Sequence, residues 1–233
     1  MSCLDNQINY TFIIPHKNTP DYLQRCLDSI PVRDDVQVIV VDDNIEIVKR
    51  SSDKNLLESE YVVFDFETTG LSAFLDDIIE IGACKVYRGD IIGEFQTFVK
   101  PKKVITKGIT DLTSISNDDV RNADPIEIVL PKFKDFCDGC ILVAHNAAFD
   151  NAHLNRNLKD LGLFTKPYPV IDTMNLAMAR YQNKIKKFGL DDVRKYFGVA
   201  LDHHHRACDD ARSTALVFIK MLRDLLNDGI RNY

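Results

Sequence analysis

The order of apolar and polar positions divides the chain into two regions joined by a polar stretch, RSSDKNLLESE, at residues 50–60. Before that stretch, the apolar runs TFIIP and VQVIVVDD flank a segment with helical spacing that follows Thr19. Neither run alternates, which is typical of strands buried on both faces of a parallel sheet. The pattern predicts a small strand-helix-strand unit over residues 1–50, a linker over 51–60 and a second domain over 61–233.

The second region begins with three strands that meet through short turns, which favours an antiparallel meander, and continues with alternating helices and strands. Its strands are expected at 61–68, 77–87, 90–99, 141–145 and 169–173. Its helices are expected from Asp124 to near Gly139 and over 149–161, 174–181, 190–197 and 209–226. This order predicts an α/β fold in which helices pack against a mixed sheet.

The composition, 45% hydrophobic and 27% charged residues in 233, is that of a soluble globular protein. No apolar stretch approaches the roughly 18 residues that a membrane span needs, and the N-terminus does not resemble a secretion signal. We therefore expect a cytoplasmic protein that does not contact membranes. Six irregularly spaced cysteines predict reduced thiols. Cys137 and Cys140 have the spacing of half a zinc knuckle, but small residues around a turn are favoured because no second pair follows.

The net charge of −6 excludes the global basic field of proteins that coat nucleic acid. Any contact with nucleic acid must therefore be local. Bound divalent metals would supply the positive charge that the chain lacks.

Several acids lie at positions from which their side chains can converge on a single site in the fold. Asp65 and Glu67 lie two apart on an apolar strand, so both point to the same side. Two neighbouring buried carboxylates need a cation, and carboxylate oxygens are preferred ligands of Mg²⁺ and Mn²⁺. Asp150 follows a strand-to-helix junction, and Asp210 opens the last helix. The alternative for Asp209 and Asp210 is a role in stabilising the helix N-terminus.

The blocks FDFETTGL, GIT, LVAHNAAFD, IDT and HRACDDA, in this order, resemble the DnaQ-type (DEDDh) exonucleases over about residues 58–226. These include the proofreading epsilon subunit of bacterial DNA polymerase III, the exonuclease domain of Gram-positive replicative polymerases and ribonuclease T. The resemblance implies a ribonuclease H-like fold and a 3′→5′ exonuclease that uses two divalent ions, Mg²⁺ or Mn²⁺.

By the same resemblance, Asp65 matches the acid that bridges both ions, and Glu67, Asp150 and Asp210 match the other three carboxylates. His205 matches the general base, five residues before the last acid. This register selects Asp210 over Asp209, and His205 over His203 and His204. Histidine titrates near neutrality, which suits proton transfer from water.

The segment after the first acid pair matches the family's pocket for the terminal nucleotide, formed by Thr68, Thr69, Gly70 and Leu71. A plain turn in which Gly70 supplies a positive φ is the alternative. Phe149 is either a stacking residue for the terminal sugar or base, or a core residue of its helix. His145 and Asn146 are expected to fix the strand-to-helix turn rather than to bind metal.

Residues 10–44 resemble the start of a family 2 glycosyltransferase, in which Asp42 or Asp43 would contact the nucleotide of a sugar donor. The acids and acceptor domain expected further along have no counterpart, so we interpret this segment as a truncated or fused remnant that serves in docking.

The resulting hypothesis is hydrolysis of phosphodiester bonds at 3′ ends of single-stranded or frayed nucleic acid, with DNA favoured over RNA. It includes a polymerase as a partner in proofreading or repair, and leaves open oligomerisation through the N-terminal segment. The alternatives are a catalytically weak nucleic-acid-binding or polymerase-associated module, and a sugar-nucleotide transferase fragment.

Overall fold

The computed structural model of the chain describes residues 10–16, 36–42, 56–200 and 206–230. The chain forms two compact units, residues 1–52 and 53–233. In the first, β1 (Tyr10–His16) and β2 (Val36–Asp42) pair in parallel, as their apolar runs predict. The helix expected between them lies outside the described residues.

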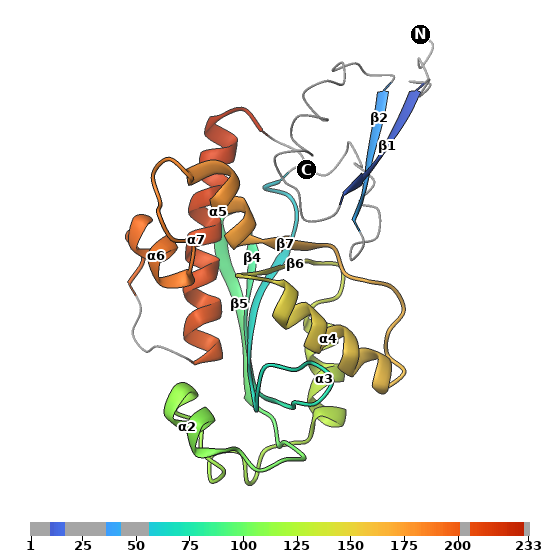
Figure 1. Cartoon of the computed structure of the whole chain (residues 1–233), viewed down its shortest axis with the longest axis vertical. Helices are drawn as coiled ribbons and strands as arrows, with labels where there is room; N and C mark the ends of the chain where they lie inside the picture. Colours follow the sequence, from blue (N-terminus) through green and yellow to red (C-terminus); the bar gives the residue numbers. More distant parts are fainter. Residues whose placement is uncertain (1–9, 17–35, 43–55, 201–205, 231–233) are drawn as a thin grey trace. The chain divides into compact units, whose positions relative to one another are not determined.

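The second unit is built on one mixed sheet (Figure 1). Its strands are β3 (Tyr61–Thr68), β4 (Ile78–Tyr87), β5 (Asp90–Phe98), β6 (Ile141–Ala144) and β7 (Val170–Asp172), in the order β5-β4-β3-β6-β7. The first three form the predicted antiparallel meander, whereas β6 pairs in parallel with β3, and β7 with β6. The central strand β3 therefore has neighbours on both sides.

The helices that the sequence predicts are present, with small shifts at their ends. They are α3 (Ile126–Phe136), α4 (Ala148–Asp160), α5 (Thr173–Tyr181), α6 (Leu190–Tyr196) and α7 (Ala207–Asn227). The helix α2 (Lys107–Thr113) was not predicted. None of the helices in the described part of the chain is long and apolar enough to cross a membrane.

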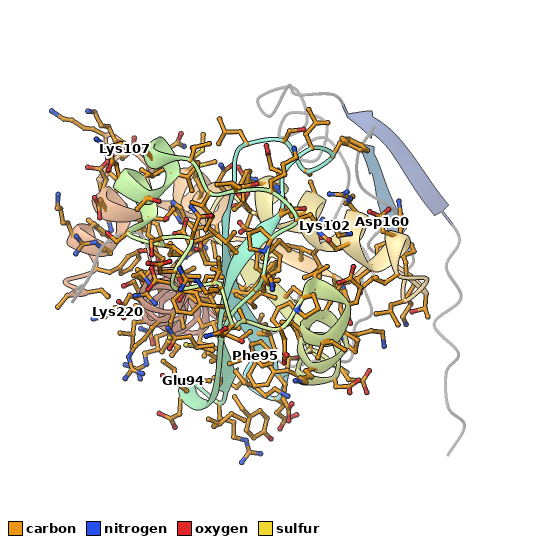
Figure 2. All side chains as sticks on the ribbon, turned by 90° about the horizontal axis from the view of Figure 1, so that it is seen from below. Glu94, Phe95, Lys102, Lys107, Asp160 and Lys220 are labelled. Atoms are coloured by element: carbon orange, nitrogen blue, oxygen red, sulfur yellow. The ribbon has the colours of Figure 1, made fainter. Side chains whose placement is uncertain are left out.

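The two faces of β3 lie in different cores because successive side chains point in opposite directions. Val62, Phe64 and Phe66 pack with residues of α3 and α4. Tyr61 and Val63 pack with residues of α7 on the other face. The same division appears on β5, where Glu94 contacts α7 and Phe95 contacts α3; both are labelled in Figure 2.

This alternation determines where the polar end of β3 points. Asp65 and Glu67 continue the series of Tyr61 and Val63, so they lie on the face that α7 covers. The N-terminal turn of α7 carries Asp210. The fold thus brings together acids that are far apart in the sequence.

Candidate active site

Three carboxylates from β3 and α7 form an acidic cluster. Asp65, Glu67 and Asp210 each offer an oxygen within 4.8 Å of the others. The two strand acids share a face, as the period of two predicts, and the third is presented by the first turn of a helix packed on that face. Such a set of carboxylate oxygens suits a hard divalent cation.

Asp150 on α4 contacts the backbone of β3 but is not one of the three acids whose oxygens lie within 4.8 Å of one another. Backbone pairing between β3 and β6 ends at Val63, and beyond it the Phe66 N–H donates to Oδ1 of Asp150 at 3.0 Å. Asp150 is buried near the beginning of α4. Because it is one of the residues whose negative charge raises the pKa of Asp65, its carboxyl group belongs to the same electrostatic site.

The start of α4 is fixed by a neighbouring acid that the sequence analysis did not single out. The Asp172 carboxylate accepts hydrogen bonds from the backbone N–H groups of Asn146 and Ala147, and also from Met174 at the start of α5. One side chain thus holds the beginnings of two helices, including the helix that carries Asp150.

The pKa values of these acids show that placing several buried carboxylates close together costs electrostatic energy. Burial, then repulsion from Asp150, Glu67 and Asp210, raises the pKa of Asp65 well above its usual value. Burial and the charges of Asp210 and Glu80 raise the pKa of Glu67 to about 8, although Arg206 opposes the shift. Burial raises the pKa of Asp150 to about 7. A bound divalent cation would offset this repulsion, so these residues fit a metal ion.

A second charged pair adjoins the cluster and was missed by the sequence analysis. Glu80 lies opposite Glu67 in the β3–β4 register and is fully buried. Its carboxylate accepts hydrogen bonds from Arg206 Nη2 at 2.8 Å and from the Ala207 N–H at 3.1 Å. The available signal was an acid inside the apolar run DIIEIGA, since a buried charge requires a partner.

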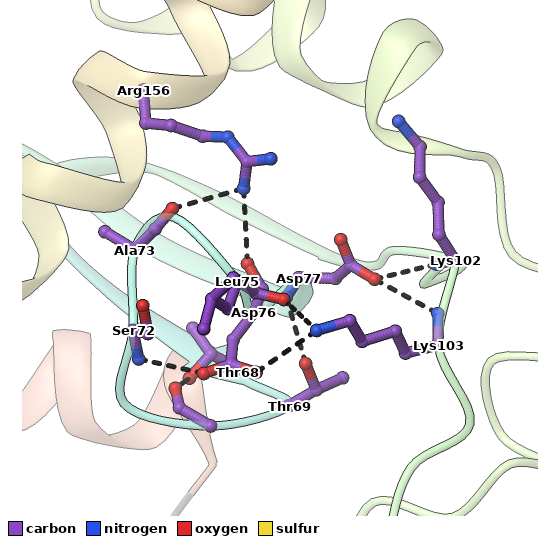
Figure 3. Close-up of polar contacts among 11 residues, drawn as sticks. Thr68, Thr69, Ser72, Ala73, Leu75, Asp76, Asp77, Lys102, Lys103 and Arg156 are labelled. Carbon is purple, nitrogen blue, oxygen red and sulfur yellow. Dashed lines mark hydrogen bonds and ion pairs between the residues drawn. The ribbon is translucent and has the colours of Figure 1, made fainter.

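The segment after Glu67 forms a loop held by internal hydrogen bonds (Figure 3). Thr68 Oγ1 donates to the Gly70 carbonyl at 2.6 Å, and Thr69 Oγ1 accepts from the Asp77 N–H at 2.9 Å. Both threonine hydroxyls therefore form hydrogen bonds that fix the conformation of the loop.

Gly70 does not have a positive φ, so the expectation that it supplies one to a turn is wrong. A Cβ at Gly70 would lie 2.5 Å from Oδ2 of Asp76. That carboxylate is itself fixed, because it accepts the Ser72 N–H at 2.8 Å. A side chain at position 70 would therefore displace the Asp76 carboxylate from this hydrogen bond.

Leu71 and Phe149 differ in exposure. The Leu71 side chain is 88% exposed, which leaves it available for contact with another molecule. Phe149 is half-buried, and its ring centroid lies 4.6 Å from that of His153 on the same helix. Phe149 therefore packs partly within the protein while retaining some exposure.

His145 and Asn146 fix the strand-to-helix turn, as expected. The His145 ring nitrogens lie 2.9 Å from Thr173 Oγ1 and 2.8 Å from the Phe188 carbonyl oxygen. Asn146 adopts a φ of 59°. His205, His203 and His204 lie outside the described residues.

Cys137 and Cys140 are buried free thiols. Across the described ranges, the one candidate metal-binding group is the acidic cluster on β3 and α7, and it contains neither cysteine. This agrees with the interpretation of the pair as small residues around a turn. Gly139 has the positive φ that such a turn uses.

The exonuclease family model RNase_T matches residues 62–218, which include nearly all of β3, the acidic cluster and more than half of α7. The chain belongs to this exonuclease family. The expectation of a 3′→5′ exonuclease is thereby confirmed.

Relatives of this exonuclease include DNA polymerases III of the PolC type. This chain is 48% identical over 193 residues to the polymerase from Caldanaerobacter subterraneus subsp. tengcongensis. The alignment covers 83% of this chain and 14% of that relative. The chain is 44% identical over 190 residues to the one from Lactococcus lactis, covering 82% and 12% respectively. The chain thus spans about a seventh of the length of these relatives. The matches give no support to the resemblance of residues 10–44 to a glycosyltransferase.

Solved structures with the same fold include exonuclease X in complex with 5′ overhanging duplex DNA. It has a TM-score of 0.57 and 28% identity, covering 70% of this exonuclease and 92% of that chain. The nuclease domain of 3′hExo, a DEDDh family member bound to rAMP, has a TM-score of 0.64 and 22% identity, covering 73% and 95%. The ribonuclease H-like fold expected from the sequence is confirmed.

Proposed function

We propose that this exonuclease removes nucleoside monophosphates from 3′ ends of single-stranded or frayed DNA, using two divalent cations held by Asp65, Glu67, Asp150 and Asp210. The observation that carries the proposal is the convergence of Asp65, Glu67 and Asp210 within 4.8 Å, in a chain of the exonuclease family. The raised pKa values of the acids support it, because cations would relieve the repulsion that causes them.

Asp65, Glu67, Asp150 and Asp210 would hold two Mg²⁺ or Mn²⁺ ions, which when bound would activate a water and stabilise the leaving 3′ oxygen. The chain's own residues provide the geometry. The negative charges of Asp150, Glu67 and Asp210 all act on Asp65, so Asp65 would hold a cation together with them. Asp210 approaches from α7. His205, which precedes α7 in the sequence, is the candidate to accept the proton of the attacking water.

The loop after Glu67 is the proposed receptor for the terminal nucleotide. Its backbone is fixed by Thr68 and Thr69, and Leu71 projects from it with 88% of its surface exposed. An exposed apolar side chain beside the acids suits contact with the face of a base. Phe149, half-buried at the start of α4, suits contact with the same nucleotide.

A role in DNA proofreading is supported by the PolC-type DNA polymerases among the relatives. Exonuclease X was solved with DNA, whereas a related 3′-exonuclease recognises a histone mRNA stem-loop, so both nucleic acids occur among the structural neighbours. We favour DNA because the relatives of higher identity are DNA polymerases. A polymerase partner and a cytoplasmic location belong to the same proposal.

The substrate is tested by giving the full chain four labelled substrates in Mg²⁺: single-stranded DNA, single-stranded RNA, a duplex with a mismatched 3′ end and a circular single strand. We expect monophosphate release from single-stranded DNA and the mismatched end, slower release from RNA, and no cleavage of the circle. Cleavage of the circle, or faster degradation of RNA than DNA, would contradict the proposal.

A further inference from the structure

The buried acid Glu80 is not one of the proposed metal ligands, but its side chain contacts α7, the helix that carries Asp210. It is fully buried near the beginning of β4 and lies opposite Glu67 across the antiparallel pair. Like charges directly opposite each other destabilise a sheet. A chain that keeps a second buried glutamate here therefore needs a cation beside it.

The guanidinium group of Arg206 supplies that positive charge and donates hydrogen bonds to both carboxylate oxygens of Glu80. Its Nη2 lies 2.8 Å from Oε1 of Glu80, and its Nε lies 3.2 Å from Oε2. The guanidinium carbon also lies 5.2 Å from the centre of the Phe98 ring. Two hydrogen bonds and a ring contact fix the orientation of a side chain that is 31% exposed.

The same carboxylate holds the first residue of α7. Arg206 occupies the N-cap position of this helix, yet its side chain makes no capping hydrogen bond. Instead, Glu80 Oε2 accepts the Ala207 N–H at 3.1 Å, so a residue of β4 satisfies a free donor at the helix end. The helix start is therefore attached to the sheet by side chain and backbone together.

The backbone of α7 lies against β4 at the same point. A Cβ placed on Gly82 would be 2.1 Å from the carbonyl carbon of Ala207. Gly82 is the partner of Asp65 in the strand register, and Glu80 is the partner of Glu67. The helix start is thus fixed directly beside the two strand acids.

Asp210 is one helical turn from Ala207, and its N–H donates to the Arg206 carbonyl at 2.9 Å. Any movement of the helix start would move Asp210 relative to Asp65 and Glu67. We propose that Glu80, through Arg206 and Ala207, is a positioning residue that holds Asp210 in the acidic cluster. This inference rests on the proposed role of Asp210 as a metal ligand.

The test is a double-mutant cycle of Glu80→Gln and Arg206→Gln in the full chain. The matched control is a cycle of Glu94→Gln and Arg212→Gln, because Glu94 on β5 pairs with Arg212 on α7, both are exposed and neither belongs to the acidic cluster. Each protein is measured for kcat, KM on single-stranded DNA, the Mg²⁺ concentration that gives half the maximal rate, and the Mg²⁺-induced rise in Tm.

We expect each Glu80 and Arg206 variant to lose roughly tenfold or more in kcat, with KM nearly unchanged, because small displacements of a reacting group are costly. The half-saturating Mg²⁺ concentration should rise several-fold and the Mg²⁺-induced shift in Tm should shrink. The double variant should have a kcat no lower than that of the less active single variant, because both substitutions break the same interaction. The control cycle should leave all four quantities unchanged.

If Glu80→Gln does not fold, the half-buried Arg206 variants and the milder Arg206→Lys carry the test. A lower Tm with unchanged kcat and Mg²⁺ response would overturn the inference and leave a purely structural pair. A higher KM with unchanged kcat would also overturn it, because Arg206 would then contact the substrate. If the parent chain degrades no DNA, the proposed function fails, while the Mg²⁺-induced shift in Tm still decides whether Glu80 positions Asp210.

Discussion

At the scale of single residues, the acidic cluster joins two acids of one strand, Asp65 and Glu67, with Asp210 from the distant helix α7. The period of two places Asp65 and Glu67 on one side of β3, and the structure agrees. The sequence shows that Asp210 opens the last helix, but the family resemblance was needed to assign it to the same site as the strand acids. Glu80 was missed because its partner Arg206 is 126 residues away, and long-range pairing is not visible in periodicity.

Two adjacent acids at the start of α7 provide a sharp test of register. Asp210→Asn should reduce turnover by about a hundredfold or more, because one of the metal-binding carboxylates is lost. Asp209→Asn should retain most activity, because Asp209 does not contribute to the acidic cluster. Steady-state rates on single-stranded DNA decide the matter, and an inactive Asp209→Asn with an active Asp210→Asn would reverse the assignment.

The shifted pKa of Glu67 predicts how metal-free stability depends on pH. Its pKa rises from 4.5 to about 8 on folding, so the folded chain holds more protons between these values. The free energy of unfolding from this group therefore falls as pH rises through that window. In chelator, Tm of the parent should decline relative to Tm of Glu67→Gln as the buffer changes from about pH 5 to about pH 8.

The comparison with Glu67→Gln is needed because other groups titrate in the same range. Burial lowers the pKa of His145 and of His153, which acts in the opposite direction in both proteins. Mg²⁺ should stabilise the parent most at the upper end of the range, where Glu67 would otherwise be repelled by its neighbours. Parallel Tm curves for parent and variant in chelator would contradict this account.

At the scale of elements, long periodic segments were predicted well and the short helix α2 was not. The helices α3, α4, α5, α6 and α7 start and end within a few residues of their expected bounds. Residues Lys107–Thr113 form a seven-residue helix capped by Thr106, with one buried side chain. Such a helix carries no apolar stripe long enough for a period of 3.6 to be recognised.

The loop between β3 and β4 is braced by α4, which suggests a role in substrate affinity. Arg156 Nη1 donates to the carbonyls of Ala73 at 3.1 Å and of Asp76 at 3.5 Å (Figure 3). Arg156→Ala should raise KM for single-stranded DNA several-fold with little change in kcat, because the loop carrying Leu71 loses its support while the acids stay in place.

Lys159→Ala is the matched control on the same helix, since Lys159 lies over the Phe164 ring and not against the loop. It should leave both kinetic constants unchanged. A fall in kcat at constant KM in Arg156→Ala would place the effect in the acidic cluster instead.

At the scale of the whole molecule, the division of the chain follows the polar stretch that the sequence shows. The unit formed by residues 53–233 contains every described acid of the cluster and the whole family match. The first unit contains the two-stranded parallel sheet β1-β2. Because a strand-helix-strand unit of about fifty residues buries little apolar surface by itself, we predict that its strands are covered by another protein surface.

Removing residues 1–52 tests this prediction. The cut retains Leu56, whose carbonyl accepts the Tyr61 hydroxyl at 2.7 Å. The remaining chain should keep its kcat, because the acids lie after the cut, but should lose stability, solubility or assembly. Tm and mass in solution are compared with those of the full chain. Equal stability and a monomeric state in both proteins would mean that the segment is a dispensable leader, and turnover of uridine diphosphate glucose by the full chain would support a transferase.

The central claim is that the acids on β3, α4 and α7 form a metal site for hydrolysis at a 3′ end. It is tested most directly by release of a labelled 3′-terminal nucleotide from single-stranded DNA as Mg²⁺ is titrated, with the parent and Asp65→Asn measured side by side. We expect the parent to release the label as a monophosphate only with Mg²⁺, and Asp65→Asn, which keeps the shape but loses the charge, to be slower by on the order of a thousandfold. Equal rates for the two proteins, or full release in excess chelator, would contradict it.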